Sequence, residues 1–208
     1  MSGLLYETHV TVACASQAEA ERLHVWAGAT GLKLTHIVLA RGRMRHQPML
    51  TLAGSASYAE ESARAERTVA ALRADGFASV RVKIESVPWA PEVPDGPCGG
   101  GQYFEHHVEL LLDADTDLGT LAGRVVPHGA HLSWNARRVH GAGRHERFVT
   151  QRCRDVCDAE AERALGRLLA ELDGHEVLGV EREFVLHDSD ESVDEGWLGE
   201  PTTQGAGV

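Results

Sequence analysis

The chain has 208 residues, of which 43% are hydrophobic and 25% charged, and its 31 acidic against 20 basic side chains give a formal net charge of −11. This is an ordinary globular composition, which excludes a mainly disordered, collagen-like or coiled-coil chain. The acidic balance also argues against general nucleic-acid binding, which requires many Lys and Arg side chains to neutralise phosphates.

Apolar periodicity divides the first half of the chain into six elements. They are strand 6–13, helix 17–29, strand 33–40, strand 47–53, helix 58–75 and strand 79–87. The second half gives the same order with strand 104–112, helix 117–126, strand 130–137, strand 147–153, helix 158–173 and strand 177–187. A glycine, with which helices commonly end, follows each helical stretch: Gly31, Gly76, Gly129 and Gly174.

Two stretches differ from the rest of the chain. PWAPEVPDGPCGGG (88–101) holds four of the seven Pro residues and four Gly residues, so it cannot continue a helix or a central strand. Residues 188–208 carry six acidic side chains and no basic one, which is typical of a mostly disordered tail, with Trp197 and Leu198 as exceptions that could dock on the body. The predicted units are 1–87, a linker over 88–103, 104–187 and the tail 188–208.

The two predicted units resemble each other in sequence. YETHVTV (6–12) aligns with FEHHVEL (104–110) at an offset of 98, RHQPMLT (45–51) with RHERFVT (144–150) at 99, and VRVKIE (80–85) with LGVERE (178–183) at 98. Steady offsets indicate an internal duplication. The order βαββαβ, taken twice, predicts an α+β protein made of tandem ferredoxin-like units. Each unit would have one antiparallel sheet with helices on one face, and the two open faces would form a pocket between the lobes.

Strand alternation predicts which side chains share the open faces. Glu7 and His9 lie on one face of the first strand, opposite the apolar side chains, and Lys83 and Glu85 do the same on the last strand of that unit. Because these strands are neighbours in a ferredoxin-like sheet, the four side chains can cluster. The second unit gathers a matching set: Glu105, His107, Glu109, Glu181 and Glu183.

These clusters suggest a metal site. His9 with Glu85, and His107 with Glu183, would offer two imidazoles and two carboxylates to one divalent cation, a donor set that suits Zn, Mn, Ni or Fe. Three further carboxylates are candidates for the general base: Glu7, Glu105 and Glu109. The alternative is that all of these residues are solvent-facing side chains on open sheets.

Two known families share parts of this pattern. The arrangement resembles the vicinal-oxygen-chelate enzymes, which place a His on the first strand and a Glu on the last strand of each repeat. That resemblance implies metal ligation by His9, Glu85, His107 and Glu183, although those enzymes have βαβββ repeats. The segment His-Val-Thr-Val (9–12) is also similar to the His-x-Thr-x motif of the bilobal two-histidine phosphoesterases, whereas the matching segment at 107–110 reads His-Val-Glu-Leu.

Basic side chains are concentrated in the two loops between the second and third strands of each unit, ARGRMRHQ and ARRVHGAGRHER. Arginine binds phosphate and carboxylate bidentately, so these loops could reach over the pocket and hold an anionic ligand. The candidate substrate-binding residues are Arg43, Arg45, Lys83, Arg144 and Arg147. The alternative is that the loops are solubilising turns whose charges pair with nearby acidic groups.

Neither a membrane nor secretion is indicated. The sequence has no apolar run of about 18 residues, and its start, MSGLLYETHV, lacks the basic and apolar regions of a signal peptide. The four Cys residues are too few and too scattered for a disulfide scaffold. We therefore expect a cytoplasmic protein without membrane contact.

Three functional hypotheses remain open. The first is an enzyme that acts on a small phosphate- or carboxylate-bearing molecule by metal-assisted hydrolysis or lyase chemistry. The second is a metal-free phosphoesterase-like enzyme with His9 and His107 as general base and acid. The third is a protein that binds a ligand or a partner without turnover, since one fold can host many functions.

Overall fold

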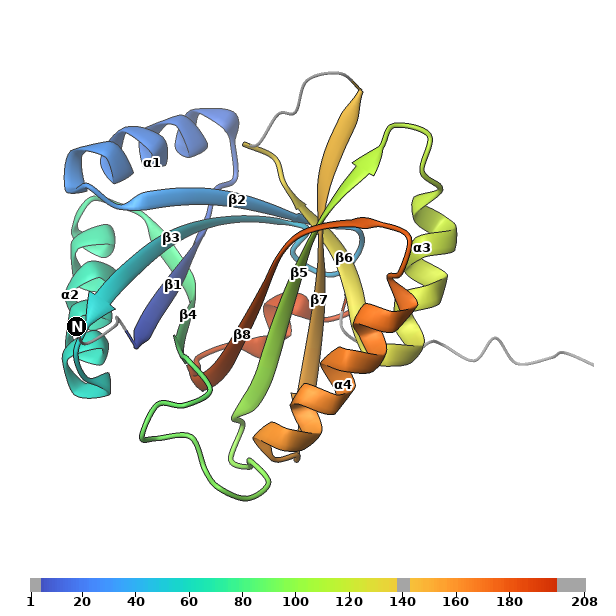
Figure 1. The fold of residues 1–208 in the computed structure, drawn as a ribbon. Helices are drawn as coiled ribbons and strands as arrows, with labels where there is room; N and C mark the ends of the chain where they lie inside the picture. The colour runs from blue at the N-terminus through green and yellow to red at the C-terminus, as the bar shows by residue number, and fades with distance from the viewer. Residues whose placement is uncertain (1–4, 138–142, 198–208) are drawn as a thin grey trace, which may run out of the picture.

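The computed structural model describes residues 5–137 and 143–197, and Figure 1 shows its fold. In chain order its elements are β1 (Tyr6–Ala13), α1 (Gln17–Thr30), β2 (Lys33–Leu39), β3 (His46–Ser55), α2 (Tyr58–Ala74), β4 (Ala78–Ser86), β5 (Tyr103–Asp113), α3 (Leu118–Val125), the 3₁₀ helix η1 (Val126–His128), β6 (Ala130–Asn135), β7 (Arg144–Arg154), α4 (Asp158–Glu171), β8 (Glu176–Asp188) and the 3₁₀ helix η2 (Glu191–Asp194).

The eight strands form one closed antiparallel barrel in the order β1-β3-β2-β6-β7-β5-β8-β4. The prediction of two ferredoxin-like units with open sheets is therefore wrong. Two seams close the barrel: residues 37–39 of β2 pair with 133–135 of β6, and residues 83–86 of β4 pair with 184–188 of β8. Closure satisfies the backbone groups that four edge strands would otherwise leave unpaired, a known liability of open sheets.

The hydrophobic core lies between the barrel wall and the helices. Figure 1 shows α1 and α2 on one side of the strands and α3 and α4 on the other. Val10 and Leu50 of the first half pack against Leu23 of α1 and Leu72 of α2, and all four side chains are fully buried. The second half builds a separate cluster of the same kind beneath α3 and α4. The apolar side chains of the strands thus point outward to the helices, and the polar side chains on the opposite face point into the barrel.

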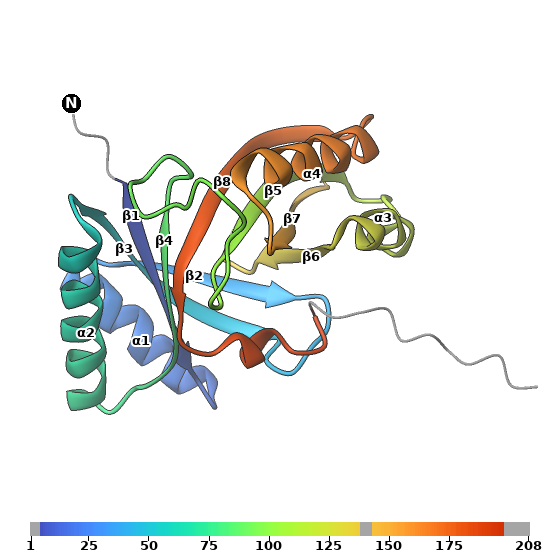
Figure 2. The ribbon, with the colours of Figure 1, turned by 90° about the horizontal axis from the view of Figure 1, so that it is seen from below.

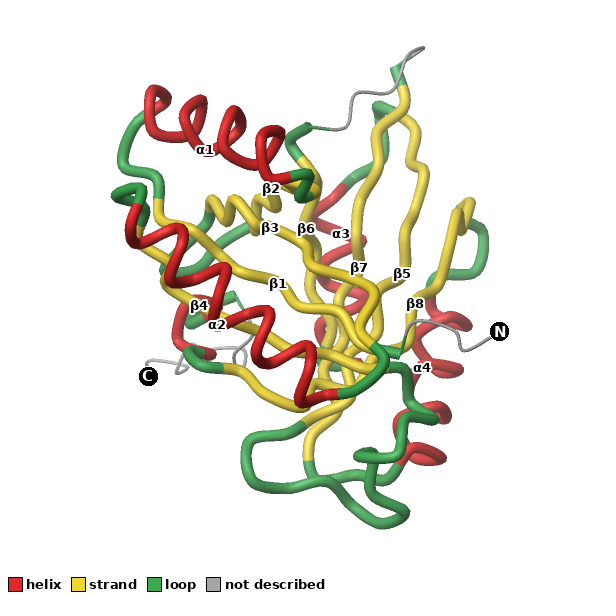
Figure 3. Tube along the Cα trace, turned by 90° about the vertical axis from the view of Figure 1, so that its left-hand side faces the viewer, coloured by secondary structure: helices red, strands yellow, loops and turns green. Residues whose placement is uncertain are grey.

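A third cluster forms where the segment between β4 and β5 folds back on the barrel. This segment is the loop at the bottom of Figure 1 and part of the loop trace in Figure 3. It buries Ala90 and Cys98 against Phe104 of β5 and Phe184 of β8, whose ring centroids lie 4.8 Å apart. The predicted linker therefore packs against the body of the protein.

The segment that follows β8 also lies against the barrel. Figure 2 shows it, in red, crossing near the ends of β2 and β3. Trp197 is only 4% exposed, and its indole Nε1 donates a hydrogen bond to the Leu132 carbonyl at 3.0 Å. The remainder of the predicted tail, 198–208, lies outside the described residues.

Replacing Phe104 by Ala should lower the free energy of unfolding by about 3–5 kcal/mol, because it removes a fully buried aromatic ring from a tight pair. Replacing Val25, which is 70% exposed on α1, by Ala should change it by less than about 0.5 kcal/mol. Urea unfolding measures both. Equal losses in the two variants would contradict the packing described for the Phe104 ring.

Candidate functional site

The polar faces of β1 and β5 line the interior of the barrel with two matching histidines. His9 Nδ1 lies 3.2 Å from Thr51 Oγ1 of β3, and His107 Nδ1 lies 3.0 Å from Thr150 Oγ1 of β7. The opposite ring nitrogens face carboxylates, so that His9 Nε2 and Glu85 Oε2 are 3.2 Å apart. His107 Nε2 lies at the same distance from Glu183 Oε2. Each half thus contributes one His held between a Thr and a Glu.

Four of the interior groups converge on one point. Glu85, Glu105, His107 and Glu183 each offer a ligand atom, and these atoms lie within 4.8 Å of one another. Glu105 Oε1 is 3.2 Å from His107 Nε2, which explains why this carboxylate joins the group. Three of the four ligands predicted from sequence are present, while Glu105, predicted as a base, takes the place of His9. Such a set of one imidazole and three carboxylates can hold a divalent cation.

Two basic side chains stand among these carboxylates. Lys83 Nζ lies 2.6 Å from Glu85 Oε1 and 2.5 Å from Glu105 Oε1. The second oxygen of Glu105 contacts Arg152. Burial favours the neutral form of Glu105, but the charges of Arg152 and Lys83 outweigh it and hold its pKa well below the ordinary value. Burial and the charge of Glu183 raise the pKa of Glu85, so Lys83 is paired chiefly with Glu105.

The two histidines differ in charge although their surroundings match in geometry. Burial, reinforced by the positive charge of Lys83, lowers the pKa of His9 to about 3. Burial also opposes the charged form of His107, but hydrogen bonds to Glu105 and Glu183 outweigh it and raise its pKa to about 10. At neutral pH the first imidazole is therefore neutral and the second is an imidazolium. A metal ion that binds His107 must displace its proton, so affinity should fall with decreasing pH.

Three residues of this cluster, Glu105, His107 and Glu183, line a cavity of about 330 Å³ in the barrel interior, whereas Glu85 is fully buried and does not belong to the lining. At one end, called the mouth here, the lining includes the exposed side chains of Lys33 and Glu181. Glu7 also lies there, and burial together with the charge of Glu183 raises its pKa to about 7. At the opposite end the lining consists of buried groups, among them Arg81 and Trp197. The cavity therefore opens to solvent at the mouth.

The remaining predicted site residues divide into two sets. Glu109 and Lys83 line the cavity, as do Glu7, His9 and Glu183. The four loop arginines do not belong to its lining, and each has another contact within the described residues. Arg43 donates a hydrogen bond to Ser192 Oγ at 2.6 Å, and Arg45 donates one to the Leu39 carbonyl at 3.4 Å. Arg144 forms an ion pair with Glu176 at 2.5 Å. The guanidinium of Arg147 lies 5.3 Å from the centroid of the Trp134 ring.

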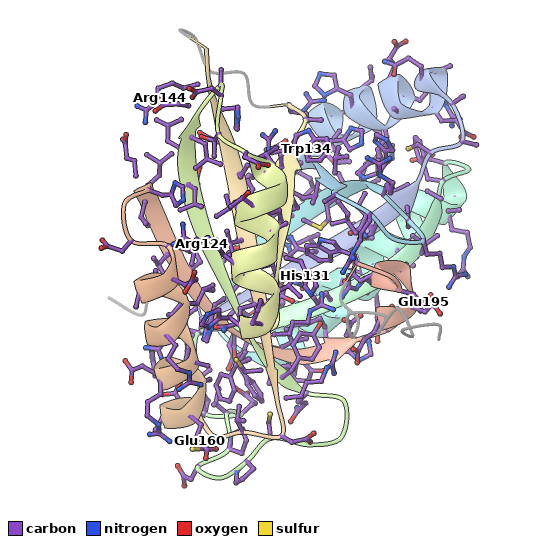
Figure 4. The ribbon with its side chains drawn as sticks, turned by 90° about the vertical axis from the view of Figure 1, so that its right-hand side faces the viewer. Arg124, His131, Trp134, Arg144, Glu160 and Glu195 are labelled. Carbon is purple, nitrogen blue, oxygen red and sulfur yellow. The ribbon has the colours of Figure 1, made fainter. Side chains whose placement is uncertain are left out.

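Arg144 and Arg147 lie on β7, and Arg43 and Arg45 lie between β2 and β3; none of the four lines the cavity. Figure 4 shows Arg144 near the end of β7 that lies away from the C-terminal segment, which is marked by Glu195. Of the predicted substrate-binding residues, only Lys83 lines the cavity.

Sequence reasoning missed two interior arginines, Arg81 of β4 and Arg152 of β7. Arg81 forms a bidentate pair with Asp188, at 2.8 Å and 2.5 Å, and a third bond to Asp194 at 2.7 Å. Arg152 bridges Glu105 and Asp194. A signal was present in both strands, because Arg81 alternates with Lys83, and Arg152 stands two residues after the inward-facing Thr150.

Comparisons with known proteins add little to this description of the site. No family model matches the chain, and no curated protein matches it significantly. Among solved structures, a crystal structure of a protein provisionally named a chlorite dismutase aligns over 94% of this chain and 100% of its own, at 15% identity and a TM-score of 0.27. At this level of similarity neither a fold family nor a function is transferred.

Within residues 5–137 and 143–197, no helix is both long and apolar enough to cross a membrane.

Replacing Asp188 by Asn should lower the free energy of unfolding by about 3–5 kcal/mol at pH 7, because buried Arg81 would keep its charge and lose its bidentate partner. Burial favours the neutral form of Asp188, but the hydrogen bond and charge of Arg81 outweigh it and lower its pKa. A carboxylate with a lowered pKa stabilises the fold above its unfolded value, about 3.9, and that contribution is lost as the pH falls through the folded value.

The difference between wild type and Asp188→Asn should therefore shrink below about pH 4. Urea unfolding at pH 7 and at pH 3 measures it, with the exposed Asp115→Asn as the matched control. A difference that stays constant between the two pH values would show that the charge of Asp188 is not what stabilises Arg81.

Proposed function

We propose that the protein is a metal-dependent enzyme that acts on a small molecule inside the barrel, by hydrolase or lyase chemistry. A divalent cation would be held by Glu85, Glu105, His107 and Glu183. The observation that supports this proposal is the convergence of these four ligand atoms within 4.8 Å, three of them on residues that line the cavity. Mixed imidazole and carboxylate donors suit Zn, Mn, Fe or Ni.

The ionised form of Glu85 is disfavoured by its surroundings, since burial and the charge of Glu183 raise its pKa. Glu85 is fully buried, and within the described residues neither of its oxygens receives a hydrogen bond of good geometry. A buried carboxylate without such bonds is unfavourable. Lys83 faces both Glu85 and Glu105 with a single charge. A divalent cation between these groups would stabilise the ionised form of Glu85.

The cation would act as a Lewis acid or lower the pKa of a bound water. Glu7 stands at the mouth with its pKa raised to about 7, which suits a group that exchanges a proton with a substrate near neutral pH. His9 is neutral, and its Nε2 faces Glu85, so its role would be to orient that ligand. An anionic substrate would meet Lys33 at the mouth rather than the loop arginines.

A second candidate is metal-free phosphoester chemistry, with His9 and His107 as base and acid. It is favoured by the two matching His–Thr contacts, which fix each imidazole in the same way on opposite walls of the cavity. At neutral pH His9 is neutral and His107 is protonated, which also fits a base and an acid. Metal binding separates the two candidates, because the phosphoesterase mechanism needs no cation.

Apo protein prepared with a chelator should bind one equivalent of Zn²⁺ or Mn²⁺ in calorimetric titration. His107→Ala and Glu183→Gln should each weaken binding by about tenfold or more, because each removes a ligand from the group. His9→Ala should weaken it less, since His9 lies outside the four converging groups.

The matched control for Glu183→Gln is Glu181→Gln, which removes a cavity carboxylate on the same strand that is not one of the four. Equal losses in both variants would indicate a diffuse charge effect instead of ligation. Wild-type protein that binds none of Zn²⁺, Mn²⁺, Ni²⁺ or Fe²⁺ would rule out the metal-dependent function and favour the phosphoesterase-like one.

Lys83→Met should bind the same cation about tenfold more tightly than wild type. The ammonium group contacts two of the carboxylates in the group, so it repels the cation and occupies their oxygens. Lys33→Met at the exposed mouth should change the affinity little and serves as the control. Weaker binding in Lys83→Met would show that Lys83 positions the ligands rather than competing with the cation.

A further inference from the structure

The carboxylate of Asp194 is held by three side chains from three different strands of the barrel. Gln47 of β3 donates to Oδ1 at 2.8 Å, and Arg81 of β4 and Arg152 of β7 each donate to Oδ2 at 2.7 Å. Asp194 itself comes from η2, outside the barrel wall, and is 2% exposed. The barrel therefore supplies a complete set of donors for one oxyanion, and the C-terminal segment supplies the anion.

The donors are held in place without Asp194. Arg81 forms its bidentate pair with Asp188, and Arg152 contacts Glu105, so each guanidinium keeps one carboxylate partner of its own. Both side chains are less than a tenth exposed. Two guanidinium groups that each direct one N–H at the same point, together with an amide donor, can bind a carboxylate or phosphate group.

The segment 189–197 is seated on the barrel at a few defined points. Ser189 exchanges hydrogen bonds with the backbone of Val82, and Arg43 N donates to the Glu195 carbonyl at 2.8 Å. Gly42 has a φ of 112°, and a Cβ at this position would lie 3.0 Å from the Glu195 oxygen and from Trp197. The loop between β2 and β3 is thus shaped to receive the segment.

We propose that Gln47, Arg81 and Arg152 form a binding site for a carboxylate or phosphate group, and that segment 189–197 is an internal inhibitor whose Asp194 occupies this site. An anionic ligand would compete with Asp194 and release the segment from that end of the barrel. The site shares the cavity with the His and Glu cluster, but it does not depend on a bound metal.

The first test uses formate, which is the size of the group that Asp194→Ala removes. In metal-free protein with chelator present, formate should raise the melting temperature of Asp194→Ala by mass action and bind it at least tenfold more tightly than it binds wild type. Asp194→Asn loses the same charge but leaves no space, so formate should not stabilise it. Glu195→Ala, at the exposed neighbouring position, should behave like wild type.

The second test uses the wild-type chain and therefore does not depend on the variant folding. Inorganic phosphate should increase amide hydrogen exchange in residues 189–197 in a saturable manner, while exchange in β5 stays unchanged. The proposal is overturned if phosphate leaves exchange in 189–197 unchanged, which would make Asp194 a fixed counter-ion of the two arginines. It is equally overturned if formate stabilises Asp194→Ala and Asp194→Asn alike. Because chelator is present throughout, neither result depends on whether the cation site exists.

Discussion

Glu105 is 1% exposed and lies between Lys83 of the first half and Arg152 of the second. Arg152 also pairs with Asp194, and Asp194 pairs with Arg81, so that basic and acidic side chains alternate along this series of ion pairs. Burying an unpaired ion costs several kcal/mol, whereas each of these groups is stabilised by a partner on another strand or on the C-terminal segment. The closed barrel and its charged interior therefore depend on each other, because the charges can be buried only where both halves contribute partners.

The features predictable from sequence are those encoded by neighbouring residues. Alternation along β1 and β5 assigns His9 and His107 to the faces opposite the apolar ones, and the duplication relates Glu85 to Glu183. The seams β2–β6 and β4–β8 could not be predicted, because they rest on three and four residue pairs between segments about a hundred residues apart. The interior position of Asp194 depends on these seams, whereas that of Arg152 is indicated by its alternation with Thr150.

The two halves have histidines at corresponding positions but differ in where their buried basic side chains stand. His9 with Glu85 and Thr51 corresponds to His107 with Glu183 and Thr150, at offsets of 98 and 99. By the same offsets Lys83 corresponds to Glu181, and Arg152 to Ala53. A barrel with identical halves would place like charges opposite each other across a small cavity, which is destabilising. The cations on β4 and β7 break that symmetry. Burial and the charge of Lys83 keep His9 neutral, whereas hydrogen bonds to Glu105 and Glu183 keep His107 charged.

The order of charged groups along the cavity limits what can bind there. A ligand that enters at the mouth passes Glu7 and Lys33, reaches the carboxylates around His107, and only then meets the arginines beside Asp194. Glu105 contacts both Lys83 and Arg152, so the carboxylate-rich and arginine-rich parts are adjacent rather than separate. A small molecule that carries a metal-binding oxygen at one end and an anionic group at the other would match this order, whereas a purely cationic one would be opposed by the two buried arginines.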